Sequence, residues 1–167
     1  MVNVTKKSAV VLLIFIFTVI LNSCTYEQRV DFSELVRRMN RWAEGYEAVL
    51  EEAFFSDGEW FLFVSSGDNN EVLLNGREDE SKLLTRVCVT ILNDTENVDS
   101  ELFFSVCENS LRAFTYNGDS EGLLSSSHLY DEGILFSDAV YFYESGRYKT
   151  SFFNSEIGST FMIEIVR

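Results

Sequence analysis

The strongest constraint on the fold is a stripe of apolar residues that recurs at intervals of three and four over residues 31–54. This spacing gives an α-helix one apolar face, which must be buried against another layer of the protein. Asp31 and Glu34 stand three residues apart at its start and resemble an N-terminal capping box. The pattern therefore predicts a first helix from Asp31 to about Phe54.

A second helix is predicted from Asp99 or Ser100 to about Phe114, with an apolar stripe of the same kind. The other apolar runs are short and bounded by turn residues, which is typical of strands. They span residues 60–64, 71–74, 83–92, 139–144, 148–153 and 160–166. The first run is apolar at every position, as in a strand that is covered on both faces. Residues 119–137 have a loop-like composition.

This order of elements leaves few long helical connections between strands. We therefore expect the α+β fold class, with a largely antiparallel sheet of about six strands and two helices packed on one face. Within residues 83–92, Val87, Val89 and Ile91 share one face, so Cys88 points to the other. Because Cys107 lies on the second helix, the two thiols are expected to be too far apart for a disulfide and to remain free.

The N-terminal segment predicts where the chain is located. It holds two lysines followed by an uncharged apolar run over residues 9–21, which is shorter than the roughly 20 residues of a membrane-spanning helix and is typical of a signal peptide. Leu21-Asn22-Ser23-Cys24 follows, and it resembles the lipobox of bacterial lipoproteins. The resemblance implies removal of residues 1–23 and attachment of a diacylglyceryl group to Cys24.

The expected organisation is a signal peptide of residues 1–23, a lipidated cysteine and short tether of residues 24–30, and one globular domain of residues 31–167. Two acyl chains hold a protein stably at a membrane, and a tether of about six residues reaches about 20 Å. The domain should therefore lie close to the lipid on the extracytoplasmic face of the cell membrane. The whole is similar to small, functionally uncharacterised lipoproteins of Gram-positive anaerobes.

Charge and motifs exclude several function classes. Without residues 1–23 the chain has 11 basic and 27 acidic residues, a formal charge of −16, which excludes nucleic acid as a partner. Residues 118–122 match the G-x-S-x-G pattern, but they follow a helix stop instead of a strand. The acidic clusters lack the spacing of a calcium loop. We therefore predict no catalytic residue, metal ligand or cofactor, and expect that the protein is not an enzyme.

Two groups of residues are candidates for binding. Tyr141, Tyr143 and Tyr148 could form a patch on an open sheet face and bind a protein or a small ligand, unless residues 119–137 cover that face. A non-enzymatic binding module of this kind is the function that we expect.

The second group is Arg37, Arg38 and Arg41, which lie near the tether and could face anionic lipid headgroups. They could equally form an exposed helix face with Glu34–Arg38 and Arg41–Glu44 pairs. The corresponding alternative function is a structural or accessory component of a cell-envelope complex, which acts through this first helix.

Overall fold

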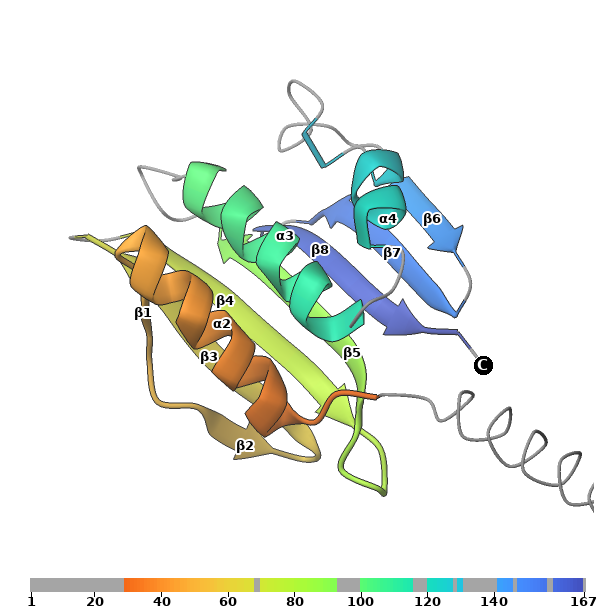
Figure 1. Cartoon of the computed structure of the whole chain (residues 1–167), viewed down its shortest axis with the longest axis horizontal. Helices are drawn as coiled ribbons and strands as arrows, with labels where there is room; N and C mark the ends of the chain where they lie inside the picture. The colour runs from red at the N-terminus through yellow and green to blue at the C-terminus, as the bar shows by residue number, and fades with distance from the viewer. Residues whose placement is uncertain are drawn as a thin grey trace, which may run out of the picture.

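The computed structural model describes residues 29–67, 70–92, 100–115, 120–127, 129–130, 141–145, 147–155 and 158–166. These residues form an antiparallel sheet of eight strands with three helices on one face (Figure 1). The α+β class and the helices on one face are confirmed, although the strands and helices are more numerous than predicted. The signal peptide and the lipobox lie outside the described residues.

The elements follow the predicted order with three additions. They are α2 (Phe32–Tyr46), β1 (Val49–Leu50), β2 (Phe54–Ser56), β3 (Glu59–Ser66), β4 (Asn70–Glu78), β5 (Leu84–Leu92), α3 (Ser100–Thr115), α4 (Ser120–Ser126), β6 (Tyr141–Ser145), β7 (Tyr148–Asn154) and β8 (Gly158–Ile165). The strand order is β1-β3-β4-β5-β8-β7-β6, and β2 pairs with the same edge of β3 as β1. The last strand therefore returns to the middle of the sheet, between β5 and β7.

Helix α2 begins as predicted but ends earlier. The Asp31 side chain caps it by accepting the Glu34 backbone N–H at 2.8 Å. The helix stops at Tyr46 because Glu47 adopts the left-handed conformation, with φ 57° and ψ 32°. The prediction of a helix as far as Phe54 is wrong, because the apolar residues beyond this cap form β1 and β2 along the edge of the sheet.

The core lies between the helices and the face of the sheet that they cover. The predicted stripe of α3 is confirmed, and that of α2 is confirmed as far as Tyr46. Leu35, Met39 and Ala43 of α2 are buried, as are the six stripe residues of α3. Those six are Leu102, Phe103, Val106, Cys107, Leu111 and Phe114. They pack with alternate residues of the strands, which leaves the other alternate residues for the opposite face.

The third helix, α4, occupies part of the segment that was expected to be a loop. It is seven residues long, and its Leu123 is completely buried. The remaining residues of α4 are mostly serine and glycine, so the segment has no extended apolar stripe from which a helix could be predicted. Burial of Leu123 by the rest of the fold determines this helix more than its own sequence does.

Candidate interaction surface

The open face of the sheet, opposite the helices, is the candidate interaction surface. In β3, Trp60, Leu62 and Val64 are buried under the helices, whereas the residues between them are only partly buried and belong to the open face. The expectation that this strand is covered on both faces is therefore wrong. No described helix lies over the open face (Figure 1).

A row of charged side chains crosses one end of the open face. Its six members lie directly opposite one another on adjacent strands: Glu59, Arg77, Arg86, Glu164, Lys149 and Glu144. Acids and bases are equal in number, and Arg86 forms an ion pair with Glu59 at 2.5 Å. Four of the five cross-strand pairs in the row join opposite charges, which stabilises a sheet, whereas Arg77 faces Arg86. The row is thus close to neutral although the whole chain is strongly acidic.

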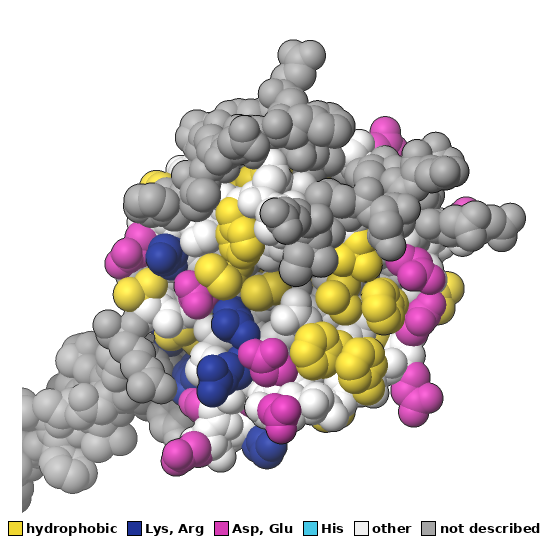
Figure 2. Space-filling model, turned by 180° about the vertical axis from the view of Figure 1, so that it is seen from behind, with side chains coloured by type: hydrophobic (Ala, Val, Ile, Leu, Met, Phe, Trp, Pro, Cys, Tyr) yellow, Lys and Arg dark blue, Asp and Glu magenta, His cyan; other side chains and the backbone are white. Residues whose placement is uncertain are grey.

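Two further rows on the same face are largely apolar. One contains Phe61, Asn75, Cys88, Met162 and Ser151, and the next contains Phe63, Leu73, Thr90, Thr160 and Phe153. Figure 2 shows apolar side chains gathered on this face, with acidic side chains along one border and a mixture of basic and acidic side chains along another. An apolar centre bordered by charge is the anatomy of a protein interface.

Beyond the charged row, a shallow depression of about 750 Å³ lies where the described chain begins. Arg29 pairs there with Asp79 at 2.7 Å, and Arg86 lines the same depression. The Leu83 backbone N–H and the Arg29 guanidinium both bind the Asp79 carboxylate and lower its pKa. These contacts fix the start of the domain to the turn between β4 and β5.

The tyrosines singled out from the sequence do not form an exposed patch. Tyr148 is buried, only 6% exposed, and its ring lies 5.8 Å from that of Phe114 on α3. Tyr143 is half-buried and packs against the core, and the side chain of Tyr141 lies outside the described part of the structure. The expected exposed surface of all three tyrosines is wrong, because Tyr143 and Tyr148 belong to the helix-covered side. Helix α4, from the segment expected to cover them, contacts β6.

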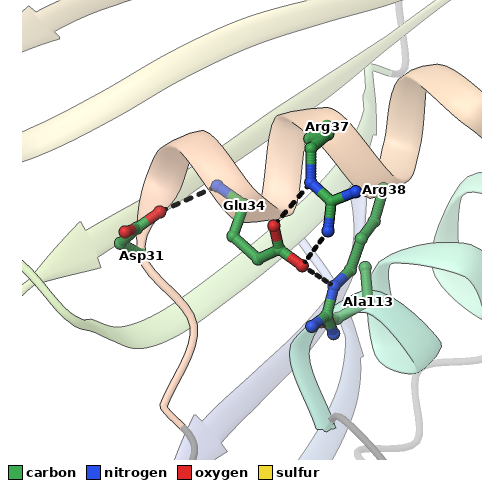
Figure 3. A network of polar contacts seen from close by, with 5 residues as sticks. All are labelled: Asp31, Glu34, Arg37, Arg38 and Ala113. Carbon is green, nitrogen blue, oxygen red and sulfur yellow. Dashed lines mark hydrogen bonds and ion pairs between the residues drawn. The ribbon is translucent and has the colours of Figure 1, made fainter.

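The arginines of α2 belong to a polar network (Figure 3). Arg37 donates to the Glu34 carboxylate at 2.6 Å and Arg38 at 2.7 Å, which confirms the expected Glu34–Arg38 pair. These bonds lower the pKa of Glu34 to about 2. Arg38 also donates to the carbonyl oxygen of Ala113 at 2.7 Å, so it joins α2 to the end of α3. Arg41 is exposed.

The cysteines lie where the sequence predicted. Cys88 is on the open face and Cys107 is buried in α3, on the other side of the sheet, and both thiols are free. Burial raises the pKa of Cys88 to about 11 and that of Cys107 well above its ordinary value. Thiols of this kind are inert packing groups and not nucleophiles.

Other chemical candidates have little structural support. Of the G-x-S-x-G pattern, Ser120 begins α4, whereas residues 118–119 lie outside the described residues. So does His128, the single histidine of the sequence and thus the one imidazole that could act as a base for this serine. In the described part of the chain, no group of three histidine, cysteine or acidic residues could hold a metal ion. Nor does any helix there have the length and apolar character needed to cross a membrane.

Comparison with protein-family models finds no match, and neither the curated proteins nor the solved structures yield a significant match.

Proposed function

We propose that this protein is a lipoprotein anchored on the extracytoplasmic face of a bacterial cell membrane, and that its domain is a non-enzymatic module that binds another protein. The binding surface is the open face of the sheet. The observation that carries this proposal is the pair of apolar rows on that face, which include Phe61, Phe63 and Leu73. The lipobox that ends in Cys24 supports the anchored location.

The shape of the surface favours a protein over a small ligand. Small-molecule sites are concave and mostly apolar. The depression beside Arg29 is instead lined chiefly by charged residues, and Arg29 and Arg86 are held there in ion pairs. The two rows cross five adjacent strands, and although Cys88 and Ser151 within them are buried, their partly exposed apolar side chains are spread over a sheet surface and not gathered in a pocket. Such a surface fits a second protein.

Charge favours a different protein over a second copy of this chain. Two copies repel one another, because each has a formal charge of −14, or −16 without residues 1–23. Acidic side chains, including the exposed Glu71 on β4, border the apolar rows. A partner with an apolar patch and basic residues around it would complement this surface.

The alternative, an accessory component of an envelope complex that acts through Arg37, Arg38 and Arg41, has less support. Two of these three guanidinium groups bind Glu34, and one of them also joins α2 to α3. Contacts within the domain therefore explain the positions of Arg37 and Arg38, whereas Arg41 is exposed.

Isolation of the protein from membranes of its native bacterium, after mild chemical cross-linking, tests the proposal. The double variant Phe63→Ser/Leu73→Ser removes apolar area from the open face, and Arg41→Ser/Glu44→Ser is the matched control on the exposed side of α2. Central apolar contacts contribute more than about 1 kcal/mol each to binding. We therefore expect the amount of partner protein isolated with the first variant to be at least tenfold lower than with the wild type. The control should recover it fully. Equal recovery by the two variants would contradict the proposal.

A further inference from the structure

Four large apolar side chains of the described residues are exposed, and two of them are neighbours on β2. Phe54 is 53% and Phe55 is 62% exposed. They precede a two-residue turn at Asp57 and Gly58, whose φ angles of 51° and 79° are the positive values that a tight type I′ hairpin requires. The β2–β3 hairpin therefore displays two phenylalanines beside its tip.

The two rings are supported from below on opposite sides of the sheet edge. Phe54 stacks on Phe61 of the open face, with ring centroids 5.0 Å apart. Phe55 packs against Phe32 on the helix side, with centroids 5.1 Å apart, and Phe32 in turn contacts the buried Trp60. The aromatic tip is thus held in place by the core, although its outer surface faces solvent.

This tip lies at the end of the domain where the chain enters it (Figure 1). Phe32 is the first residue of α2 and stands three residues after Arg29, where the described chain begins. The Arg29–Asp79 ion pair and the bond from the Leu84 N–H to the Val30 carbonyl fix this entry point. Cys24 is five residues before Arg29, a reach of about 18 Å.

We infer that the β2–β3 hairpin is a membrane contact, in which Phe54 and Phe55 enter the interface of the lipid bilayer that holds the anchor. This inference rests on the proposed lipidation of Cys24, because the short tether then holds this end of the domain at the lipid surface. Aromatic side chains are favoured at the membrane–water interface. Exposed apolar side chains are unfavourable in water, and at the interface they would be buried against lipid.

The charges at this end permit such an approach. Three ion pairs neutralise part of the charge there, namely Arg29–Asp79, Arg86–Glu59 and Lys82–Glu78. Asp57 in the hairpin turn and the exposed Glu80 add negative charge, so an uncharged phosphatidylcholine surface suits this end better than an anionic one. Anchoring through the hairpin tip would direct β3 and β4 away from the membrane. The apolar rows of the open face would then remain accessible from the side to the protein partner.

Spin labels on the lipidated protein in phosphatidylcholine vesicles test the inference. Phe54→Cys and Phe55→Cys each provide a label position at the tip, and Tyr130→Cys provides a control at an exposed aromatic residue whose contacts are with Phe104 and Glu108 of α3. Labelled wild-type protein gives the background from the two buried thiols. The measurement compares how accessible each spin label is to oxygen, which enters lipid, and to a nickel complex, which stays in water. The oxygen-to-nickel accessibility ratio should be at least threefold higher at positions 54 and 55 than at position 130.

A ratio at both tip positions equal to that at position 130, in protein that floats with the vesicles, would overturn the membrane contact and leave the anchor intact. Wild-type protein that does not float would refute the anchor, and the inference with it. Because both tip residues are more than half exposed, either label should be tolerated, and thermal unfolding of each variant checks that the fold is kept.

Discussion

The indole ring of Trp60 occupies the space in which a side chain at position 76 would lie. Trp60 and Gly76 are direct partners across β3 and β4. A Cβ atom on Gly76 would overlap the Trp60 ring and the carbonyl oxygen of Arg86. Trp60 is completely buried, so glycine at position 76 is what allows the largest side chain of the sheet to fill the core.

Gly76→Ala should therefore destabilise the domain by about 1–3 kcal/mol, since an overpacked core forces neighbouring groups to move. Chemical denaturation measures the change. Gly45→Ala in α2 is the control, because its Cβ would meet nothing within 4 Å. That substitution should stabilise the domain by about 0.5–1 kcal/mol. Unchanged stability of Gly76→Ala would show that Trp60 is not confined as described.

The Glu34 network predicts a pH dependence of stability. Hydrogen bonds from Arg37 and then Arg38 lower the pKa of Glu34 from 4.5 to about 2 in the folded protein. Because the folded pKa lies below the unfolded one, the contribution is present above about pH 4.5 and is lost as the pH falls towards 2. Glu34→Gln should thus be less stable than the wild type at pH 7, and the difference should vanish near pH 2.

A background that lacks both donors provides the control for that prediction. In Arg37→Gln/Arg38→Gln, the additional change Glu34→Gln should have no pH-dependent effect on the free energy of unfolding. The free energies of unfolding of Glu34→Gln and the wild type could instead differ by the same amount from pH 7 to pH 2. That result would mean that the network does not hold the carboxylate in its ionised form.

The separation of the two buried cysteines predicts their reactivity. Native mature protein at pH 8 should react slowly with iodoacetamide, because burial raises the pKa of both Cys88 and Cys107. After denaturation without reductant, both thiols should be alkylated. Mass spectrometry that found a linked Cys88–Cys107 peptide would disprove the placement of these residues on opposite sides of the sheet.

Lipid attachment at Cys24 is tested by metabolic labelling with a fatty-acid analogue. The wild-type protein should be labelled, and Cys24→Ala should lose the label, since the thiol is the expected attachment point of the diacylglyceryl group. Cys88→Ala is the matched control and should label like the wild type. Undiminished labelling of Cys24→Ala would remove the basis of the anchor.

Helix positions could be predicted from the sequence because a stripe of period 3.6 has few alternative explanations. The end of α2 could not, because Glu47 adopts a left-handed cap that is far more common for glycine. The apolar residues that follow it fit the edge of a sheet as well as they fit a longer helix. Their actual partners in β3 depend on tertiary pairing.

It was harder to predict which residues of each strand point towards the helices than to predict that the strand exists. Residues 60–64 are apolar throughout, so period-two alternation did not show that Phe61 and Phe63 belong to the open face. In β6 and β7, apolar and aromatic residues occupy both faces, and the buried Tyr148 shows that the tyrosines were assigned to the wrong side. Strand order, which decides what each face meets, is a long-range property that local patterns do not contain.

Site-specific photo-cross-linking in the native bacterium tests the central claim most directly. A photoreactive phenylalanine analogue replaces Phe63 on the open face or Glu44 on the exposed side of α2. If the open face binds a protein partner, position 63 should give one dominant cross-linked protein in the membrane fraction, and position 44 should not give that product. No cross-linked product from position 63, or the same product in equal yield from position 44, would contradict the account.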